Sequence, residues 1–237
     1  MARETHPSVW VVVPAAGRGV RAGSGVPKQY RLLLGRPVIE HTLRTLATHP
    51  QVRGVAVVLA ADDDRWPGWD MLEGKPVLAV TGGAERADSV LAGLNALPQD
   101  LEDDAFVLVH DAARPCVSHR DIDALLDAAS PRGAVLAVPL ADTLKRADDD
   151  NLVRDTVPRD GLWRALTPQM FQRAALMRAL RDARDAGVVV TDESMAMERA
   201  GIAPVLVAGS ADNLKITTPR DFALAEFLLR AADKDST

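Results

Sequence analysis

Short apolar runs rich in valine recur along the chain, and their alternation with segments of helical spacing constrains the fold more than any other feature. Several of the runs show almost no polar alternation, which is typical of strands buried on both faces of a parallel sheet. They are residues 9–13, 55–60, 76–80, 105–110, 134–140 and 204–208. The sequence therefore predicts an α/β fold with three layers, α/β/α, around a mostly parallel, Rossmann-like sheet.

The intervening segments carry apolar residues at helical spacing. Ile122, Leu125, Leu126 and Ala129 form an i, i+3, i+4, i+7 stripe, and similar stripes occur around residues 39–46 and 90–97. Further helices are predicted near residues 170–186 and 219–232. We interpret these stripes as core-facing surfaces that pack helices onto the sheet.

The alternation is interrupted at about residues 141–168, which have no long apolar stripe. A polar turn at residues 148–150 separates two short extended pieces there. This pattern predicts a β-arm that projects from the domain rather than a linker between two domains. We therefore expect residues 1–237 to form one domain, with the arm as a dimerisation element.

Length, charge and cysteine content limit the class of protein. With 237 residues, 47% of them hydrophobic, the chain can bury the core of a globular domain. A formal net charge of −5 argues against broad nucleic-acid binding, which requires many phosphate-neutralising cations. The single cysteine, Cys116, suits a reducing cytoplasm. No apolar run approaches the roughly 20 residues of a membrane span, so we expect a cytoplasmic protein that binds neither membrane nor nucleic acid.

A glycine-rich loop follows the first predicted strand, in the stretch VWVVVPAAGRGVRAGSGVPKQY. Residues 17–22 match the dinucleotide fingerprint GxGxxA, but the second strand ends about 40 residues further on, where the fingerprint expects an acidic residue after about 20. The cations Arg18, Arg21 and Lys28 suit a triphosphate better than a dinucleotide. A solvated basic loop with structural glycines remains the alternative.

An aspartate ends the fourth predicted strand, in VLVHDAARP. Asp111 should therefore lie at the same carboxyl edge of the sheet as the glycine loop. A carboxylate there is well placed for Mg²⁺, which binds through one or two carboxylates together with substrate phosphates. Arg114 would orient Asp111 or bind an anion. The structural alternative is a helix-capping aspartate.

Two further clusters follow predicted strands at the same edge. In TGGAERADSVLAGL, Gly82 and Gly83 allow the backbone to approach a ligand closely, and Ser89 could contact a base or ribose. Lys215, in GSADNLKITTPRD, is a cation after the last strand. Asp88 and Ser89 would also suit the start of a helix with no ligand. The position of all these clusters at successive strand ends is what indicates a ligand site.

These stretches together resemble the 2-C-methyl-D-erythritol 4-phosphate cytidylyltransferase family of the non-mevalonate isoprenoid pathway. The resemblance rests on PAAGRGVRAG, PKQY, GGAERADSVLAGL, VHDAARP, DTLKR, GLWRALTPQ, TDE and ADNLKIT, in the family's order from about Val9 to Leu229. It implies the nucleotide-diphospho-sugar transferase type of sheet, a divalent cation such as Mg²⁺, and a homodimer joined by β-arms. It also implies CMP transfer from CTP to methylerythritol phosphate, by in-line attack of the substrate phosphate on the α-phosphate with release of pyrophosphate.

The resemblance also implies roles for individual residues. Arg21 and Lys28 would stabilise the transition state, and Arg159 and Lys215 would position methylerythritol phosphate. The other residues expected to bind this substrate are Arg114, Thr143, Thr167 and Thr191. The nucleotide site would comprise Pro14, Ala15, Ala16, Gly17, Gly19, Gly82, Gly83, Ser89 and Asp111, with Asp111 also holding the metal.

The chain departs from the family pattern at two positions, where Ala84 and Val20 replace an acidic and a basic residue of many members. Ala84 therefore offers the nucleotide no polar side chain. The nearest alternative function is a cytidylyltransferase for another polyol phosphate, such as ribitol 5-phosphate. A nucleotide-binding protein without activity and an NAD-dependent oxidoreductase are more distant alternatives.

Overall fold

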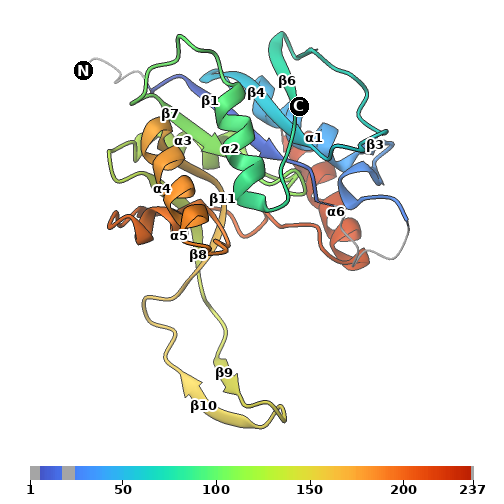
Figure 1. The fold of residues 1–237 in the computed structure, drawn as a ribbon. Helices are drawn as coiled ribbons and strands as arrows, with labels where there is room; N and C mark the ends of the chain where they lie inside the picture. The colour runs from blue at the N-terminus through green and yellow to red at the C-terminus, as the bar shows by residue number, and fades with distance from the viewer. Residues whose placement is uncertain (1–5, 18–24, 236–237) are drawn as a thin grey trace, which may run out of the picture.

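The valine-rich runs form the parallel strands of a central sheet (Figure 1). The computed structural model describes residues 6–17 and 25–235, and within these ranges the sheet has eight strands. The parallel strands are β1 (Val9–Pro14), β4 (Val52–Leu59), β6 (Lys75–Thr81), β7 (Phe106–Val109), β8 (Ala134–Pro139) and β12 (Val205–Ala208). All six predicted strands are thus confirmed, with ends that shift by a few residues.

The strand order is β12-β8-β11-β7-β1-β4-β6-β5. Two strands run against the others: β11 (Trp163–Gln172) pairs antiparallel with β7 and β8, and β5 (Met71–Leu72) pairs antiparallel with β6. The sheet is therefore mixed but mostly parallel, as predicted. Because β1 pairs in parallel with both β4 and β7, the carboxyl ends of these strands meet at one edge, where open α/β sheets bind ligands.

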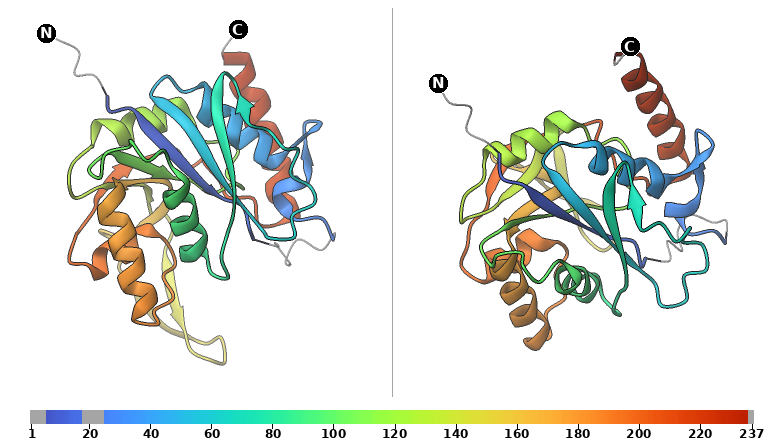
Figure 2. Two further views of the ribbon diagram at one scale, coloured as in Figure 1. Left: turned by 45° about the horizontal axis from the view of Figure 1, so that its top comes forward. Right: turned by 90° about the horizontal axis from the view of Figure 1, so that it is seen from above.

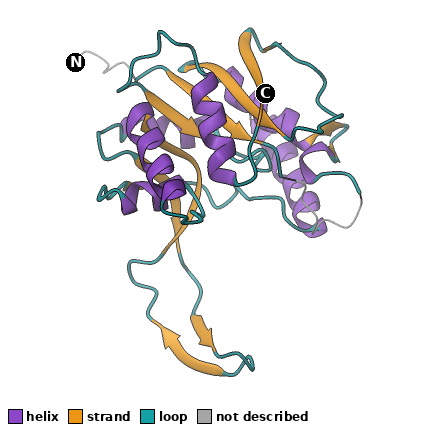
Figure 3. Ribbon diagram, viewed as in Figure 1, coloured by secondary structure: helices purple, strands orange, loops and turns teal. Residues whose placement is uncertain are grey.

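Helices cover both faces of the sheet, which gives the predicted three layers (Figures 2 and 3). The helices α1 (Val38–Thr48) and α3 (His119–Asp127) lie on one face, and α2 (Arg86–Ala96), α4 (Arg173–Asp185) and α5 (Glu193–Arg199) lie on the other. The last helix, α6 (Pro219–Asp235), lies beside α1 and contacts the short strand β2 (Leu32–Leu33), which pairs with β3 (Arg36–Pro37).

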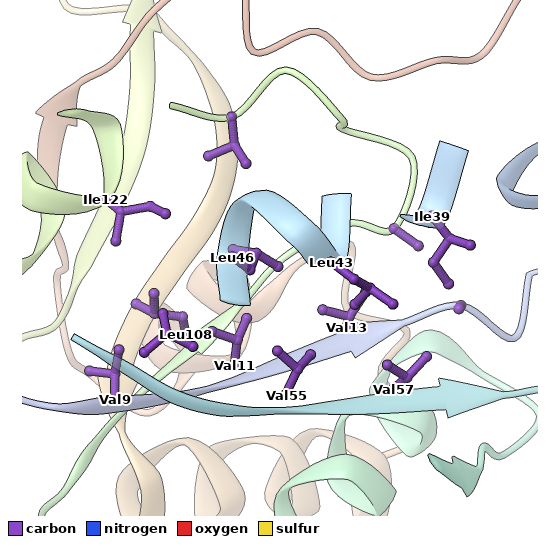
Figure 4. Close-up of a cluster of buried hydrophobic side chains, with 14 of the residues drawn as sticks. Val9, Val11, Val13, Ile39, Leu43, Leu46, Val55, Val57, Leu108 and Ile122 are labelled. Carbon is purple, nitrogen blue, oxygen red and sulfur yellow. The ribbon is translucent and has the colours of Figure 1, made fainter. Parts of the chain in front are cut away.

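The predicted helical stripes are the surfaces that pack on the sheet. Ile39, Leu43 and Leu46 of α1 are fully buried in the same cluster as Val11 and Val55 of the sheet (Figure 4). On the opposite face, the stripe of α2 joins residues of α4 and α5 in a second cluster. Full burial of a valine or leucine side chain stabilises the fold by about 1.5–3 kcal/mol, so these two clusters hold the three layers together.

A long β-arm leaves the sheet after β8 and returns to it at β11 (Figure 1). Its two strands, β9 (Leu144–Ala147) and β10 (Val153–Val157), pair antiparallel around a turn near Asn151, which has a φ of 62°. The extended pieces and their polar turn are as predicted. The boundary at residue 168 is wrong, because residues 163–172 pair with β7 and β8 in the central sheet.

The structure also corrects the prediction for the segment that follows the arm. The helix expected at residues 170–186 begins at Arg173, because residues up to Gln172 continue β11. Helix α5 has no counterpart among the predicted helices. Its seven residues are too few for a clear periodicity, and its start is fixed by Asp192, whose carboxylate accepts a hydrogen bond of 3.0 Å from the Met195 amide.

Residues 6–17 and 25–235 contain no helix of the length and apolar character that a bilayer crossing demands.

Candidate active site

A pocket of about 250 Å³ opens at the carboxyl edge of the sheet. Its walls come from the ends of β1 and β7, the turn after β6, the start of α2, the 3₁₀ helix η2 (Lys28–Tyr30) and the loop after β12. The residues that line it are Pro14, Ala15, Ala16, Gly17, Lys28, Gln29, Gly83, Ala84, Glu85, Arg86, Ser89, Asp111, Ala112, Ala113 and Lys215. The edge of the sheet thus gathers motifs from both ends of the sequence.

The start of the glycine loop is held in place by a buried glutamine. Gln29, which is 4% exposed, donates hydrogen bonds from its side-chain nitrogen to the carbonyls of Ala15 (2.8 Å) and Gly17 (3.1 Å). Because η2 buries Gln29 and Tyr30, the same short helix presents Lys28 to the pocket. One structural unit therefore fixes both the loop backbone and the cation beside it.

The turn between β6 and α2 brings the backbone close to the pocket. A side chain at Gly82 would come within 2.6 Å of the Ser89 hydroxyl oxygen, so only glycine fits there. Ser89 is 3% exposed and lines the pocket. Helix α2 begins with a capping box between Glu85 and Asp88, which explains Asp88 structurally, whereas Ser89 retains the position expected of a ligand contact.

Asp111 lies at the centre of a cluster of cations. Its Oδ2 is 3.1 Å from the Arg114 Nε and 3.0 Å from the Lys215 Nζ, and its Oδ1 is 3.6 Å from the Arg86 Nη2. Burial alone would raise the pKa of the Asp111 carboxyl, but Lys215, Arg86 and Arg114 together hold it well below its usual range. Asp111 is therefore ionised at neutral pH.

A buried hydrogen-bond network braces this cluster from behind. The Thr167 hydroxyl accepts a hydrogen bond from the Asp111 amide (3.0 Å) and lies 3.0 Å from the His110 Nδ1, while the His110 Nε2 lies 3.1 Å from the Arg114 carbonyl. These partners are all satisfied if His110 is neutral with its proton on Nε2. Burial lowers the pKa of His110 to about 4, which agrees with the neutral form.

The same network ties down the loop that carries Lys215. Asn213 is fully buried. Its side-chain amide donates a hydrogen bond to the Thr167 backbone carbonyl (2.7 Å), and its backbone carbonyl accepts one from the Arg114 guanidinium (2.8 Å). Lys215 is thereby held next to Asp111, although these residues come from opposite halves of the chain.

The remaining predicted site residues lie elsewhere. Gly82, Arg114 and Thr167 do not line the pocket, and the Thr167 hydroxyl is hydrogen-bonded to the Asp111 amide and lies 3.0 Å from the His110 Nδ1. Three others are exposed and do not line this pocket: Thr143, Arg159 and Thr191. Arg159 donates to the Ala141 carbonyl at the root of the arm, and Thr191 contacts the Met195 sulfur at 3.6 Å. The loop positions Arg18, Gly19, Val20 and Arg21 lie outside the described residues.

Sequence reasoning missed four residues that shape the site: Gln29, Arg86, Glu193 and Asn213. Each lies in one of the motif stretches, within three positions of a predicted site residue. An isolated buried polar residue produces no periodic pattern in the sequence. Its contacts with the groups that form the pocket are visible only in the fold. The strongest hint in the sequence is that PKQY, GGAER, TDE and ADNLK each contain an additional polar residue.

Two carboxylates line this pocket, Asp111 and Glu85, and Glu85 caps helix α2. In the described part of the chain, no group of three or more His, Cys, Asp or Glu residues is arranged around a metal position. Asp111 lines the pocket and fits the other mode, in which Mg²⁺ uses one carboxylate and the substrate's phosphates. The Asp111 Oδ2 has two cationic groups at hydrogen-bond distance, the Arg114 guanidinium and the Lys215 ammonium. The Arg86 guanidinium, which lies beside the Oδ1, is 3.6 Å away from it.

Comparison with known proteins gives a consistent result. A family model described as 2-C-methyl-D-erythritol 4-phosphate cytidylyltransferase matches residues 9–231. A protein of that name from Stenotrophomonas maltophilia (strain K279a) is 57% identical over 224 residues, which cover 94% of this chain and 97% of the relative. Another from Xanthomonas campestris pv. campestris (strain 8004) is 56% identical over 229 residues, covering 96% of this chain and 86% of the relative.

A solved structure agrees with these relatives. The crystal structure of 2-C-methyl-D-erythritol 4-phosphate cytidylyltransferase from Thermus thermophilus matches with a TM-score of 0.75 and 33% sequence identity, over 94% of this chain and 99% of that one. The family model, the relatives and the solved structure agree: the chain belongs to the 2-C-methyl-D-erythritol 4-phosphate cytidylyltransferase family.

Proposed function

We propose that the pocket at the carboxyl edge of the sheet performs the family's reaction, the transfer of CMP from CTP to 2-C-methyl-D-erythritol 4-phosphate with release of pyrophosphate. The observation that carries this proposal is the convergence of Lys28, Asp111 and Lys215 with the glycine-loop backbone in one pocket. Cations and open backbone amides in a cleft are what a reaction between two phosphate-bearing substrates requires.

The nucleotide half of the site is formed by backbone and small side chains. The backbone of residues 14–17 and Gly83 would contact the phosphates and cytidine, and Ser89 would contact the base or ribose. Lys28 lies on the same wall and would neutralise charge that develops on the leaving pyrophosphate. Arg21 is proposed for the same role because its position in the sequence matches the family motif.

Asp111, together with phosphate oxygens of CTP, would hold Mg²⁺. When bound, the cation would neutralise triphosphate charge and orient the α-phosphate. Asp111 also orients Lys215 and Arg114 through its Oδ2 (3.0 and 3.1 Å), so one carboxylate would link the nucleotide half of the site to the acceptor half.

The nucleophile would be the phosphate of the acceptor itself. A phosphate monoester has a second pKa of about 6, so it is largely dianionic at neutral pH and needs no general base. His110, which adjoins the cluster, has both ring nitrogens next to protein groups and would serve as a brace rather than a base. Lys215 would attract the incoming phosphate.

The obstacle to the reaction is repulsion between two anions. Two unit charges about 4 Å apart repel by about 1 kcal/mol in water and by about 4 kcal/mol near a protein surface. Lys28 on one side and Lys215 on the other would offset this repulsion as the phosphates align. The rate gain would come from alignment and from charge that is already in place.

A substrate panel tests the function. Pyrophosphate release is measured with CTP and each of several polyol phosphates, including methylerythritol phosphate and ribitol 5-phosphate. We expect strong turnover only with methylerythritol phosphate. Turnover confined to ribitol 5-phosphate would reject the acceptor while keeping the reaction class, and no turnover with any acceptor would reject both.

The β-arm is proposed to join two copies of the chain. It projects away from the domain (Figure 1) and carries Leu152 and Val153, each 65% exposed. Arg159 lies at the root of the arm and does not line its own chain's pocket. Contact with a second copy would cover the apolar tip and would bring Arg159 to the partner's acceptor site.

Mixed dimers test whether Arg159 acts across the interface. Arg159→Ala and Lys28→Ala chains, each inactive alone, are co-expressed with different tags. If the arm acts in the partner's site, one site of each mixed dimer has both intact residues. An equal mixture should then recover about a quarter of wild-type activity, since half of the dimers are mixed. Mixed dimers that stay inactive would show that Arg159 does not act in trans.

A further inference from the structure

A buried ion pair lies beside the pocket. Glu193, the first residue of α5, is fully buried, and Arg86, the first residue of α2, lines the pocket. The guanidinium binds the carboxylate through both of its terminal nitrogens, with Nη2 at 3.1 Å from Oε2. The pair joins residues 107 positions apart.

The pair places a carboxyl group and a guanidinium together inside the protein. Burial raises the pKa of the Glu193 carboxyl, and Arg86 opposes this rise. Conversely, Glu193 raises the pKa of the Arg86 guanidinium against the effect of burial. Each group therefore depends on the other, because an unpaired charge at such a position is strongly destabilising.

Arg86 also faces a second carboxylate, that of Asp111. Its Nη2 lies 3.6 Å from the Asp111 Oδ1, which is beyond the usual hydrogen-bond range of about 2.7–3.2 Å. By contrast, Arg114 and Lys215 approach the Asp111 Oδ2 to 3.1 and 3.0 Å. The guanidinium is thus bound to Glu193 and held just short of Asp111.

We propose that Glu193 is a positioning residue, which holds Arg86 away from the Asp111 Oδ1 so that this oxygen stays available to the ligand in the pocket. Without the Glu193 charge, the nearest anion for Arg86 is Asp111. A shift of well under 1 Å would bring Nη2 from 3.6 Å to about 2.9 Å, an ordinary charge-assisted hydrogen bond. The Asp111 carboxylate would then be occupied by protein cations on both oxygens.

This inference rests on the proposed function and explains the TDE stretch, of which Glu193 is the last residue. Asp192 caps α5 and accepts a hydrogen bond of 2.8 Å from Gln169, so the start of α5 is fixed to β11. Glu193 is therefore delivered to Arg86 by a rigid element. The TDE stretch would thus act on the nucleotide side of the pocket indirectly, through the position of Arg86.

The test uses Glu193→Gln, Arg86→Gln and the double variant. Glutamine keeps the shape of Glu193 but removes its charge, so Arg86 should move onto Asp111. We expect kcat/KM for CTP to fall by about 10- to 100-fold in E193Q, as for other residues that support a ligand-binding group. In the double variant no guanidinium remains to block Asp111, and most of the lost activity should return.

Two further measurements separate positioning from a purely structural role. Calorimetric titration with CTP and Mn²⁺ should show weaker binding to E193Q and recovery in the double variant. A crystal structure of E193Q should place the Arg86 Nη2 within hydrogen-bond distance of the Asp111 Oδ1. Glu198→Gln, an exposed change on the same helix, is the matched control and should leave kinetics and binding unchanged.

The outcomes are distinct. A folded E193Q with wild-type kcat/KM overturns the proposal, and so does a double variant that is no more active than E193Q. If E193Q does not fold, the double variant decides alone: near-wild-type turnover supports the proposal and a hundredfold loss overturns it. Wild-type turnover in the same assay keeps these outcomes separate from a failure of the proposed function.

Discussion

Replacing Lys28 with alanine should lower kcat by about 100- to 1,000-fold while the protein stays folded, which corresponds to about 2.7–4 kcal/mol of lost transition-state stabilisation. Lys28 lies on the pocket wall next to the glycine-loop backbone, where the triphosphate would bind. Removing its charge leaves the developing pyrophosphate without a cation on that side. The effect should fall on kcat more than on KM, because the charge that Lys28 offsets grows in the transition state.

The fold should tolerate this change because the neighbouring side chains hold η2. Gln29 and Tyr30 are buried, and both make hydrogen bonds that do not involve Lys28, to Ala15 and Asp63. Steady-state kinetics and thermal unfolding on the same sample measure both parts of the prediction. Lys75→Ala, at the start of β6 and at the opposite edge of the sheet, is the matched control. Turnover of the Lys28 variant near that of Lys75→Ala would remove Lys28 from the transition state.

Asp111→Asn should damage activity and stability together. Asp111 is 8% exposed, and its carboxylate is the common partner of Arg86, Arg114 and Lys215. We expect a loss of about 3 kcal/mol in the free energy of unfolding, at the lower end for a broken buried ion pair, because Lys215 can still reach water. We expect activity to fall by at least about a hundredfold, since both halves of the site lose their common anchor.

Chemical denaturation gives the change in unfolding free energy, and pyrophosphate release at saturating CTP gives the change in rate. Asp123→Asn serves as the control: it removes the same charge from α3, where Asp123 pairs with His49 at 3.1 Å away from the pocket. Equal stability losses in the two variants would contradict the central role of Asp111. Full activity in a folded Asp111→Asn protein would exclude it from the site.

The sheet and its flanking helices are predictable because both depend on local patterns. Strand β1 is buried on both faces and is apolar throughout, and β4 is buried and apolar except at Arg53 near its start. Helix α1 shows its core stripe directly. Strand β11 is not recognisable as a whole, because it combines exposed residues at the arm root with buried residues from Leu166 onward. Its direction depends on the pairing with β7 and β8, which no local pattern encodes.

The site is predictable where a residue follows a parallel strand, and not where it acts through another residue. Asp111 and Lys215 lie at the predicted edge because strand ends converge there. Gln29 and Glu193 escape sequence reasoning because their importance lies in hydrogen bonds to distant groups. The family motif suggests Thr167 as a substrate contact, whereas in the structure its hydroxyl interacts with the Asp111 amide and the His110 ring.

The reversed direction of β11 has a consequence for how this fold can change in evolution. Two parallel strands are joined by a crossover, which runs from the carboxyl edge of the sheet back to its amino edge and usually contains an α-helix. The β8–β11 connection instead leaves and re-enters at the ligand edge, since Trp163 pairs with Pro139. Insertions or deletions in this hairpin leave the register of the sheet unchanged. The chain can therefore vary the length of its arm, and so its reach toward another molecule, independently of the catalytic domain.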